Sequence, residues 1–337
     1  ACFHYSVNGD VLANGPYVSH DDGEHYVLSR AGFNGICVGG RYNWNPNHPN
    51  IMAIGSQDFN GGYTLDYGKT WKYVNWSRLG WGGFTYGSYM FNENDGFCCV
   101  SKTWEPTGEI RVTHDGGNTI LDTGCIMKET AVACGVPGHE DIAFIGEWRT
   151  ADRGYTFEKM DNCSAVFTFD EKTGRLYGKS GKSALVVSDD LGVTWNIIYD
   201  FPGTIYDIAV NSRDGYIHVI ADNSGIKSEY YRGRTVDCPS FESRDYGSVE
   251  ARSVCIDPVE PSIVYICCSC HKYDIDSVMR SMDDGETFTC LNRHPGDGRK
   301  GPAAGMCAGQ GRVNPVTREL FVAGGCRGIW KISAPIR

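Results

Sequence analysis

The sequence predicts an all-β fold, a single seven-bladed β-propeller, and three observations support this prediction. First, a pattern of the form Ser/Thr-x-Asp-x-Gly-x-Thr-aromatic recurs along the chain, at the roughly 40- to 50-residue spacing of four-stranded propeller blades. Second, the copies reach across nearly all of the 337 residues, so we expect one domain, residues 1–337, without a linker. Third, the 43 Gly residues suit the many tight turns of such a fold.

The pattern has five close copies and one degenerate copy. They span residues 64–71, 113–120, 150–157, 188–195 and 281–288, with the degenerate copy at 19–26. A short Asp side chain can accept hydrogen bonds from backbone N–H groups about two residues ahead, and Gly supplies the positive φ of a tight turn. The flanking Thr and aromatic residues favour strands. Each copy therefore predicts a hairpin between two strands.

These copies resemble the Asp-box, or bacterial neuraminidase repeat, of sialidases, two-propeller xyloglucanases and sortilin-like receptors. In such proteins the box is structural and lies at the hairpin of the two outer strands of a blade. The resemblance, together with the tendency of Asp to bond its own backbone, implies that the box carboxylates hold turns and are not catalytic. The Asp residues concerned are Asp66, Asp115, Asp152, Asp190 and Asp283.

Each blade is expected to run as strands a, b, c and d, with the box between c and d. The two ends of the chain each supply only part of a blade. Joined, residues 1–30 and 305–333 would form one blade shared by both termini, which removes the open sheet edges of the ring. Six or eight blades are the alternatives to seven.

Composition excludes several classes of partner. The net charge is −10 and no basic run occurs, which argues against nucleic acid and against an anionic membrane surface. No apolar stretch approaches the roughly 20 residues of a spanning helix, so we expect no membrane insertion. The first residues do not resemble a signal peptide. Fifteen Cys favour disulfides in an oxidising setting, and hence an extracellular, secreted or virion-surface protein.

The segment Cys267-Cys-Ser-Cys270-His271 fits the C-x-x-C-H pattern of covalent haem attachment. It begins in a predicted apolar strand of a cysteine-rich chain, so we interpret it as a chance match or a disulfide pair. A zinc site here would lack a second cluster with ligand spacing. We therefore expect no cofactor and no metal.

Chemistry is expected on the face opposite the boxes, where the b–c loops and the d–a connections meet, because loops on a rigid scaffold carry function. Trp rings that stack on sugars and carboxylates that act as acid and base would suit a glycan. The candidate catalytic residues are Asp58, Glu105 and Glu147. The candidate substrate-binding residues are Asn60, Trp76, Arg78, Trp81, Trp104, Trp148, Asp222 and His271. The alternative for the Trp residues is that they wedge between blades as core.

Residues 54–63 resemble the first-blade motif of the two-propeller xyloglucanases, in which an Asp shortly before Gly-Gly-aromatic lies at the cleft and serves catalysis. Asp58 matches that Asp, and Gly61, Gly62 and Tyr63 match the Gly-Gly-aromatic. Those enzymes place their second carboxylate on a second propeller, whereas this chain has length for one. The alternative is that Asp58 caps its own loop.

Two functions are consistent with these features. The chain recognises a polysaccharide and cleaves it as a glycosidase, or it is a non-catalytic module that binds glycan or protein, such as a phage tail receptor-binding or decorating protein or a secreted adhesin. Partner proteins in a larger assembly fit the second function. A sialidase is disfavoured, because the chain has no Arg-Ile-Pro motif and no spacing selects an arginine triad.

Overall fold

The structure is a computed structural model that describes sixteen stretches of the chain. They are residues 4–5, 11–12, 17–19, 24–25, 27–28, 37–39, 42–57, 60–79, 84–102, 108–128, 132–223, 228–234, 240–268, 278–291, 310–324 and 328–333. Within them the chain forms strands and no helix. Accordingly, none of these stretches is a helix that could cross a bilayer.

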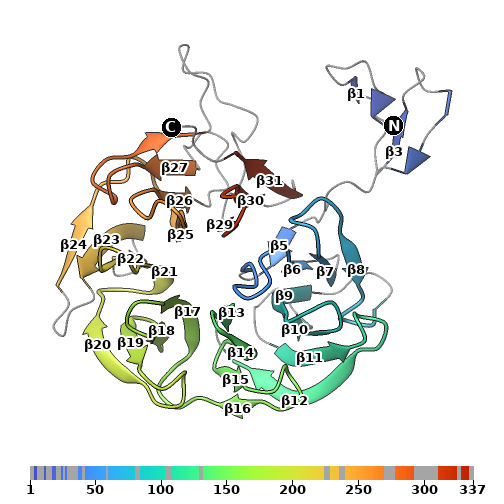
Figure 1. Ribbon diagram of the computed structural model, residues 1–337, viewed down its shortest axis with the longest axis horizontal. Coiled ribbons are helices and arrows are strands. Elements are labelled where there is room, and N and C mark those ends of the chain that lie inside the picture. Colours follow the sequence, from blue (N-terminus) through green and yellow to red (C-terminus); the bar gives the residue numbers. More distant parts are fainter. Residues whose placement is uncertain are drawn as a thin grey trace.

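The strands form a ring of seven antiparallel blades, as predicted (Figure 1). Blade 1 holds β5 (Cys37–Gly39), β6 (Met52–Gln57), β7 (Asn60–Thr64) and β8 (Lys72–Val74). Blade 2 holds β9 (Phe84–Met90), β10 (Asp95–Ser101), β11 (Gly108–His114) and β12 (Leu121–Met127). Blade 3 holds β13 (Ala133–Val136), β14 (His139–Ile145), β15 (Trp148–Thr150) and β16 (Glu158–Lys159).

The second half of the chain completes the ring. Blade 4 holds β17 (Ala165–Asp170), β18 (Arg175–Ser180), β19 (Ala184–Ser188) and β20 (Asn196–Asp200). Blade 5 holds β21 (Ile205–Asn211), β22 (Tyr216–Asp222), β23 (Ser228–Arg234) and β24 (Phe241–Arg244). Blade 6 holds β25 (Ala251–Ile256), β26 (Val264–Cys268), β27 (Val278–Ser281) and β28 (Thr289–Cys290). Blade 7 holds β29 (Gln310–Val313), β30 (Leu320–Gly324) and β31 (Gly328–Ile332).

The predicted blade shared by both termini is not confirmed. The N-terminal strands β1 (His4–Tyr5), β2 (Val11–Leu12), β3 (Tyr17–Ser19) and β4 (Val27–Leu28) pair with one another in a sheet of their own. In the described part of the chain, β29, β30 and β31 form a three-stranded sheet.

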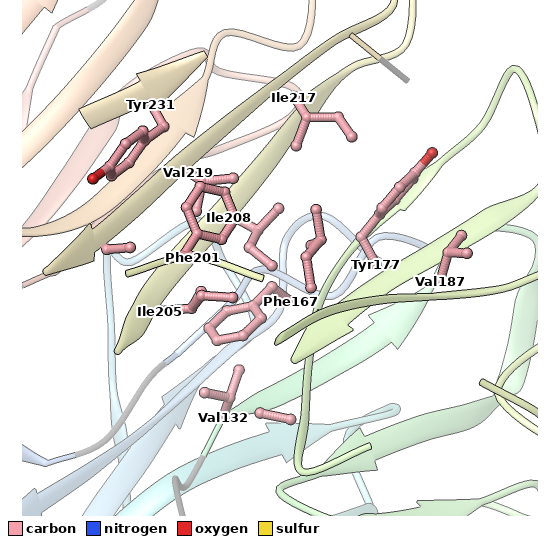
Figure 2. Packing of buried hydrophobic residues seen from close by; sticks show 13 residues of the cluster. Val132, Phe167, Tyr177, Val187, Phe201, Ile205, Ile208, Ile217, Val219 and Tyr231 are labelled. Carbon is pink, nitrogen blue, oxygen red and sulfur yellow. The ribbon is translucent and has the colours of Figure 1, made fainter. Parts of the chain in front are cut away.

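The ring closes by packing blade 7 on blade 1. Phe321 of β30 lies in one apolar cluster with Met52 and Ile54 of β6 and with Trp44. The Tyr42 hydroxyl also donates to the Phe321 carbonyl at 3.1 Å. The other six pairs of neighbouring blades each enclose a similar cluster. Figure 2 shows the cluster between blades 4 and 5.

The antiparallel order gives the ring two distinct faces. The a–b and c–d turns that the structure describes, such as residues 171–174 and 189–195 of blade 4, lie on one face, here called the hairpin face. The b–c turns and the d–a connections, such as residues 181–183 and 201–204, lie on the other, here called the loop face.

The recurrent Asp residues hold the c–d turns of the hairpin face. In blade 4, Thr194 donates its amide to Asp190 Oδ1 at 2.8 Å and its hydroxyl to Asp190 Oδ2 at 2.6 Å. Gly192, at φ 85°, donates its amide to the Ser188 hydroxyl at 2.9 Å. The same Thr amide bond forms in the other four copies. The donor is thus four residues ahead of the Asp, not about two.

The cysteines show no disulfide framework in the described part of the chain. Its nine described Cys side chains form no disulfide with one another. Cys98 and Cys99 are both buried, as are Cys267 and Cys268 of β26. Burial raises the pKa of Cys134 to about 12, so this thiol stays protonated and unreactive at neutral pH. The expected disulfides are therefore not observed among these residues; Cys270 and His271 lie outside them.

Candidate functional site

Five of the predicted site residues lie outside the described residues. They are Asp58, Trp81, Trp104, Glu105 and His271. The other six, Asn60, Trp76, Arg78, Glu147, Trp148 and Asp222, are described. The structure therefore gives no distance between the carboxyl group of Asp58 and that of Glu147 or Glu105, the two partners expected for it in catalysis.

The strands that carry the Asp58 loop are held unusually close to blade 2. The Thr85 hydroxyl of β9 accepts from the Ser56 amide at 2.9 Å and donates to the Ser56 carbonyl at 3.0 Å. A Cβ on Gly55 would lie 2.9 Å from the Tyr86 carbonyl oxygen, and one on Gly61 would lie 2.3 Å from the Ile54 carbonyl oxygen. The glycines of the predicted motif thus permit the close approach of backbones. Gly55 lies in β6 and Gly61 in β7, the two strands that flank residues 58–59.

Asn60 and Trp76 serve the scaffold of the loop face. Asn60 is buried at φ 61°, and its amide group donates to the Tyr73 hydroxyl at 2.9 Å. Its Oδ1 accepts from the Ser77 amide at 2.7 Å. Trp76 is 1% exposed and packs with Tyr63 in the cluster between blades 1 and 2. Trp76 therefore packs between two blades as part of the core, which is the alternative stated for the Trp residues above. Neither Asn60 nor Trp76 exposes its side chain to a ligand.

Arg78 lies on the surface in an ion pair. Its Nη2 donates to both carboxylate oxygens of Asp122, at 2.6 Å to Oδ2. Asp122 also lies 2.9 Å from Nε of Arg111. The hydrogen bond from Arg78 holds the pKa of Asp122 below its usual value. Exposed pairs contribute little stability, so Arg78 remains available to an anionic group that displaces Asp122.

Glu147 lies in the b–c turn of blade 3, and Trp148 begins the next strand, β15. Glu147 is only 5% exposed; its Oε1 accepts from the Lys128 amide at 3.1 Å, and its buried Oε2 has no hydrogen-bond partner. Trp148 packs against the cluster between blades 2 and 3, and its Nε1 donates to the Ile126 carbonyl at 3.3 Å. Catalysis by Glu147 would require this turn to open.

Asp222 ends β22 at the loop face. Its carboxylate accepts from the Thr204 amide and from the Tyr206 hydroxyl, both at 2.9 Å. The Arg252 guanidinium lies over the Tyr206 ring, 4.2 Å from its centroid. Asp222 therefore orients a Tyr–Arg pair of blades 5 and 6 at the loop face, and neither Tyr206 nor Arg252 was predicted from the sequence.

A cavity of about 430 Å³ lies on the hairpin face, where no site was predicted. It forms where the inner strands β17, β21, β25 and β29 end, at the mouth of the central channel. A neighbouring hollow of about 240 Å³ shares Phe167, Phe169 and Arg312 with it. Pockets of a few hundred Å³ are the usual size for small-molecule and peptide side-chain binding.

A buried ion pair lies beneath this cavity. Arg312 of blade 7 donates from Nη1 and Nη2 to the two carboxylate oxygens of Asp207 in blade 5, at 2.9 and 3.1 Å. Arg312 also donates to the Asn43 side chain, whose amide donates to the Ala133 carbonyl of blade 3 at 2.6 Å. Burial opposes the charge of Arg312, yet Asp207 raises its pKa above the ordinary value. The network joins distant blades across the channel.

A second repeat marks the cavity wall and could have been found in the sequence. In six blades the a–b turn begins with an Asn or Asp that accepts hydrogen bonds from its own turn. The residues are Asn45, Asn92, Asp170, Asn211, Asp257 and Asn314. Each comes after an aromatic or β-branched residue, and three precede Pro. Blade 3 lacks such a residue, and Asn47 of blade 1 instead accepts from Gly138 at 2.7 Å.

Within the described stretches, no group of three or more His, Cys, Asp and Glu side chains is arranged to hold a metal ion. Of the two acids that line the cavity, Glu171 is exposed and Asp257 is engaged in an ion pair. Asp257 receives two hydrogen bonds of 3.0 Å from Nε of Arg318.

Comparison with solved structures supports the fold. The GH74 xyloglucanase from Xanthomonas campestris is 14% identical, with a TM-score of 0.63, over 90% of this chain and 52% of that one. The GH74 enzyme from Niastella koreensis is 15% identical, with a TM-score of 0.64, over 91% and 54%. The chain thus spans about half the length of these enzymes. A structure of YCF48 bound to D1 peptide is 13% identical, with a TM-score of 0.59, over 96% and 97%.

No protein-family model and no curated protein sequence matches the chain, so the Asp-box resemblance is not confirmed. At these identities the likeness to solved structures concerns the fold alone. The chain is a seven-bladed β-propeller similar in fold to one half of the GH74 enzymes and to the whole of YCF48.

Proposed function

We propose that this propeller recognises a polysaccharide on its loop face, with Asp58 as the central polar contact. The observation that carries the proposal is the glycine-built frame around the Asp58 loop, in which Gly55 and Gly61 let neighbouring backbones approach closely. Ligand binding requires side chains carried on a rigid scaffold, and the strands β6 and β7 that flank residues 58–59 are such a scaffold. The resemblance of this segment to the xyloglucanase motif, and the fold shared with GH74 enzymes, point to glycan as the ligand.

Recognition without cleavage is the form of this function that the described geometry favours. A glycosidase needs two carboxyl groups at about 5–5.5 Å or about 6.5–9.5 Å, both open to the sugar. Glu147 is buried within its turn, and one of its oxygens is engaged by the Lys128 amide. We therefore propose a glycan-binding module, with hydrolysis as the outcome to exclude.

The test is a panel of soluble polysaccharides that includes xyloglucan, scored for binding by calorimetry and for new reducing ends. We expect binding without new reducing ends. Asp58→Asn should weaken binding about tenfold or more, because an aligned hydrogen-bond acceptor is lost. Asp161→Asn is the matched control, since Asp161 is exposed on the same face between β16 and β17. Unchanged binding by Asp58→Asn, or equal losses in both variants, would refute the proposal.

A protein-binding module is the second candidate, favoured by the fold that this chain shares with YCF48, a propeller whose structure holds a D1 peptide. The candidate predicts a peptide ligand and no polysaccharide in the same panel. The partner proteins expected from the sequence belong to this candidate.

The placement of the protein outside the cell, secreted or on a virion surface, is also a proposal. It predicts disulfides among the fifteen Cys of the native protein. Mass spectrometry after alkylation in denaturant, with and without reductant, counts them directly. Fifteen alkylated thiols without reductant would contradict the proposed placement.

A further inference from the structure

We propose that the cavity on the hairpin face binds an extended peptide segment of a partner protein, with a Lys or Arg side chain placed against Glu171. The inference goes beyond the glycan site and gives the second candidate function a site and a ligand chemistry. It rests on different residues from the loop-face proposal, so the two can fail separately.

The wall of the cavity consists of open strand edges. The inner strands β17, β21, β25 and β29 are each the first strand of a sheet, with a hydrogen-bonded neighbour on one side only. At the mouth, each ends in an apolar residue and then the Asn or Asp of its turn. The apolar residues are Phe169, Val210, Ile256 and Val313, and all four line the cavity.

The backbone groups of three of these residues, Phe169, Val210 and Ile256, point into the channel, whereas the Val313 amide bonds to the Cys255 thiol of blade 6. The residue after each one bonds to its own blade: Gly174 donates to Asp170, Gly215 to Asn211, Asp257 to Ile263, and Asn314 to Glu319. Because bonding alternates along an antiparallel strand, the preceding residue directs its N–H and C=O away from the blade. Such groups are those that a peptide strand pairs with when it adds to a sheet edge.

Deeper in the channel, the equivalent backbone groups already form hydrogen bonds with side chains of the protein. The Asp207 carboxylate accepts from the amides of Ile208 and Val254, at 3.1 and 3.0 Å. The Ser253 hydroxyl accepts from the Gly311 amide at 2.9 Å. These bonds confirm the alternation, since Ile208, Val254 and Gly311 each lie two residues before a mouth residue. The protein thus satisfies the inner edge itself and leaves the mouth groups of Phe169, Val210 and Ile256 to a ligand.

The charges around the cavity select a basic ligand residue. Among the charged residues that line it, Arg312 is paired with Asp207, Asp257 with Arg318, and Arg213 with Asp214 and Glu260. Glu171 is exposed and forms no ion pair within the described part of the chain. An extended peptide would therefore place apolar side chains on the mouth residues and a cation on Glu171. Of the two aromatic side chains that line the cavity, Phe167 is buried and Phe169 is partly exposed.

The test uses the intact chain, immobilised, and three libraries of pentapeptides whose two ends are chemically blocked. The central residue is Lys in one library, Glu in the second and norleucine in the third, and the other four positions are random. Mass spectrometry quantifies the retained fraction. We expect the Lys library to be retained best and its backbone N-methylated form to be lost, because methylation removes the amide donors of strand pairing. Xylo- and gluco-oligosaccharides serve as competitors. Their displacement of the peptides would overturn the proposal in favour of a glycan site.

Two variants locate the binding. Ser212→Trp fills the mouth from the a–b turn of blade 5 and should weaken retention about tenfold or more. Glu93→Trp, on the equivalent exposed turn of blade 2, is its matched control and should retain the library. Glu171→Lys, an exposed change that leaves the core intact, should shift the preference from the Lys to the Glu library. No retention of any library, or the same preference in Glu171→Lys, overturns the proposal.

Discussion

The hairpin face and the loop face of this ring are built by different means. On the hairpin face, five c–d turns and six a–b turns are closed by a side chain of their own segment, as Asp190 closes its c–d turn and Asp257 its a–b turn. On the loop face, side chains reach across blades, as Thr85 of blade 2 does to Ser56 of blade 1. Local bonds make the hairpin face repeat from blade to blade. Bonds between blades make each part of the loop face unique.

This contrast shows where sequence repeats inform about function and where they do not. A repeat reports the local chemistry of a turn, so it identifies the fold and the face on which the turns lie. It says nothing of a ligand, because a ligand contacts side chains from several blades. Substitutions on each face can therefore measure how much of its stability comes from local bonds or from bonds between blades.

The largest effect is expected from the buried pair across the channel. Arg312→Met leaves the fully buried Asp207 carboxylate without its cation, which should cost about 3–5 kcal/mol in the free energy of unfolding. Urea denaturation measures the loss. Arg175→Gln, which removes an exposed pair with Asp189 at 2.7 Å, is the control and should cost about 0–1 kcal/mol. Equal losses in the two variants would show that the pair does not hold the ring.

A smaller effect is expected from the frame of the loop face. Gly61→Ala places a Cβ about 2.3 Å from a backbone oxygen that cannot move aside cheaply. Overpacking of this kind costs about 1–3 kcal/mol, and it should also displace the Asp58 loop and weaken glycan binding. At Gly124, with φ 74° and open space around it, alanine costs only the conformational strain, about 1 kcal/mol. Thermal unfolding together with the polysaccharide assay would reveal whether stability and binding change together.

The smallest effect is expected from a single c–d turn, and it depends on pH. Hydrogen bonds from the Thr194 hydroxyl and amide lower the pKa of Asp190 to about 2. The folded state thus favours the carboxylate, so its contribution is complete above the unfolded pKa of about 3.9 and is lost as pH falls towards 2. Asp190→Asn should therefore be slightly less stable than the natural chain at pH 7. Denaturation curves at several pH values should show the difference shrinking between about pH 4 and pH 2, and a constant difference would contradict this assignment.

The sequence predicted the parts of the fold that local chemistry determines. The five Asp turns and the seven blades are indicated by residues within eight positions of one another. The a–b turns are equally local, since Asn211 and Asp257 bond amides two or three residues ahead. Their pattern is harder to recognise in the sequence, because the position holds either Asn or Asp and the lengths of the turns differ.

The remaining features depend on residues far apart in the chain. Arg312 and Asp207 are separated by 105 positions, and nothing in either local segment indicates the pair. Likewise, Trp76 was a candidate ligand contact because Trp suits both sugars and cores, and only its packing against Tyr63 shows that it belongs to the core. The closure of the ring by Phe321 on blade 1 is of the same kind.

The two faces are proposed to carry separate binding sites, for glycan on the loop face and for peptide on the hairpin face. A crossed binding experiment separates them: Asp58→Asn and Ser212→Trp are each titrated with the best polysaccharide and with the best peptide of the Lys library. We expect Asp58→Asn to weaken only the polysaccharide and Ser212→Trp to weaken only the peptide. If one variant lost both ligands, or if both variants still bound both ligands, the two faces would not act as separate sites.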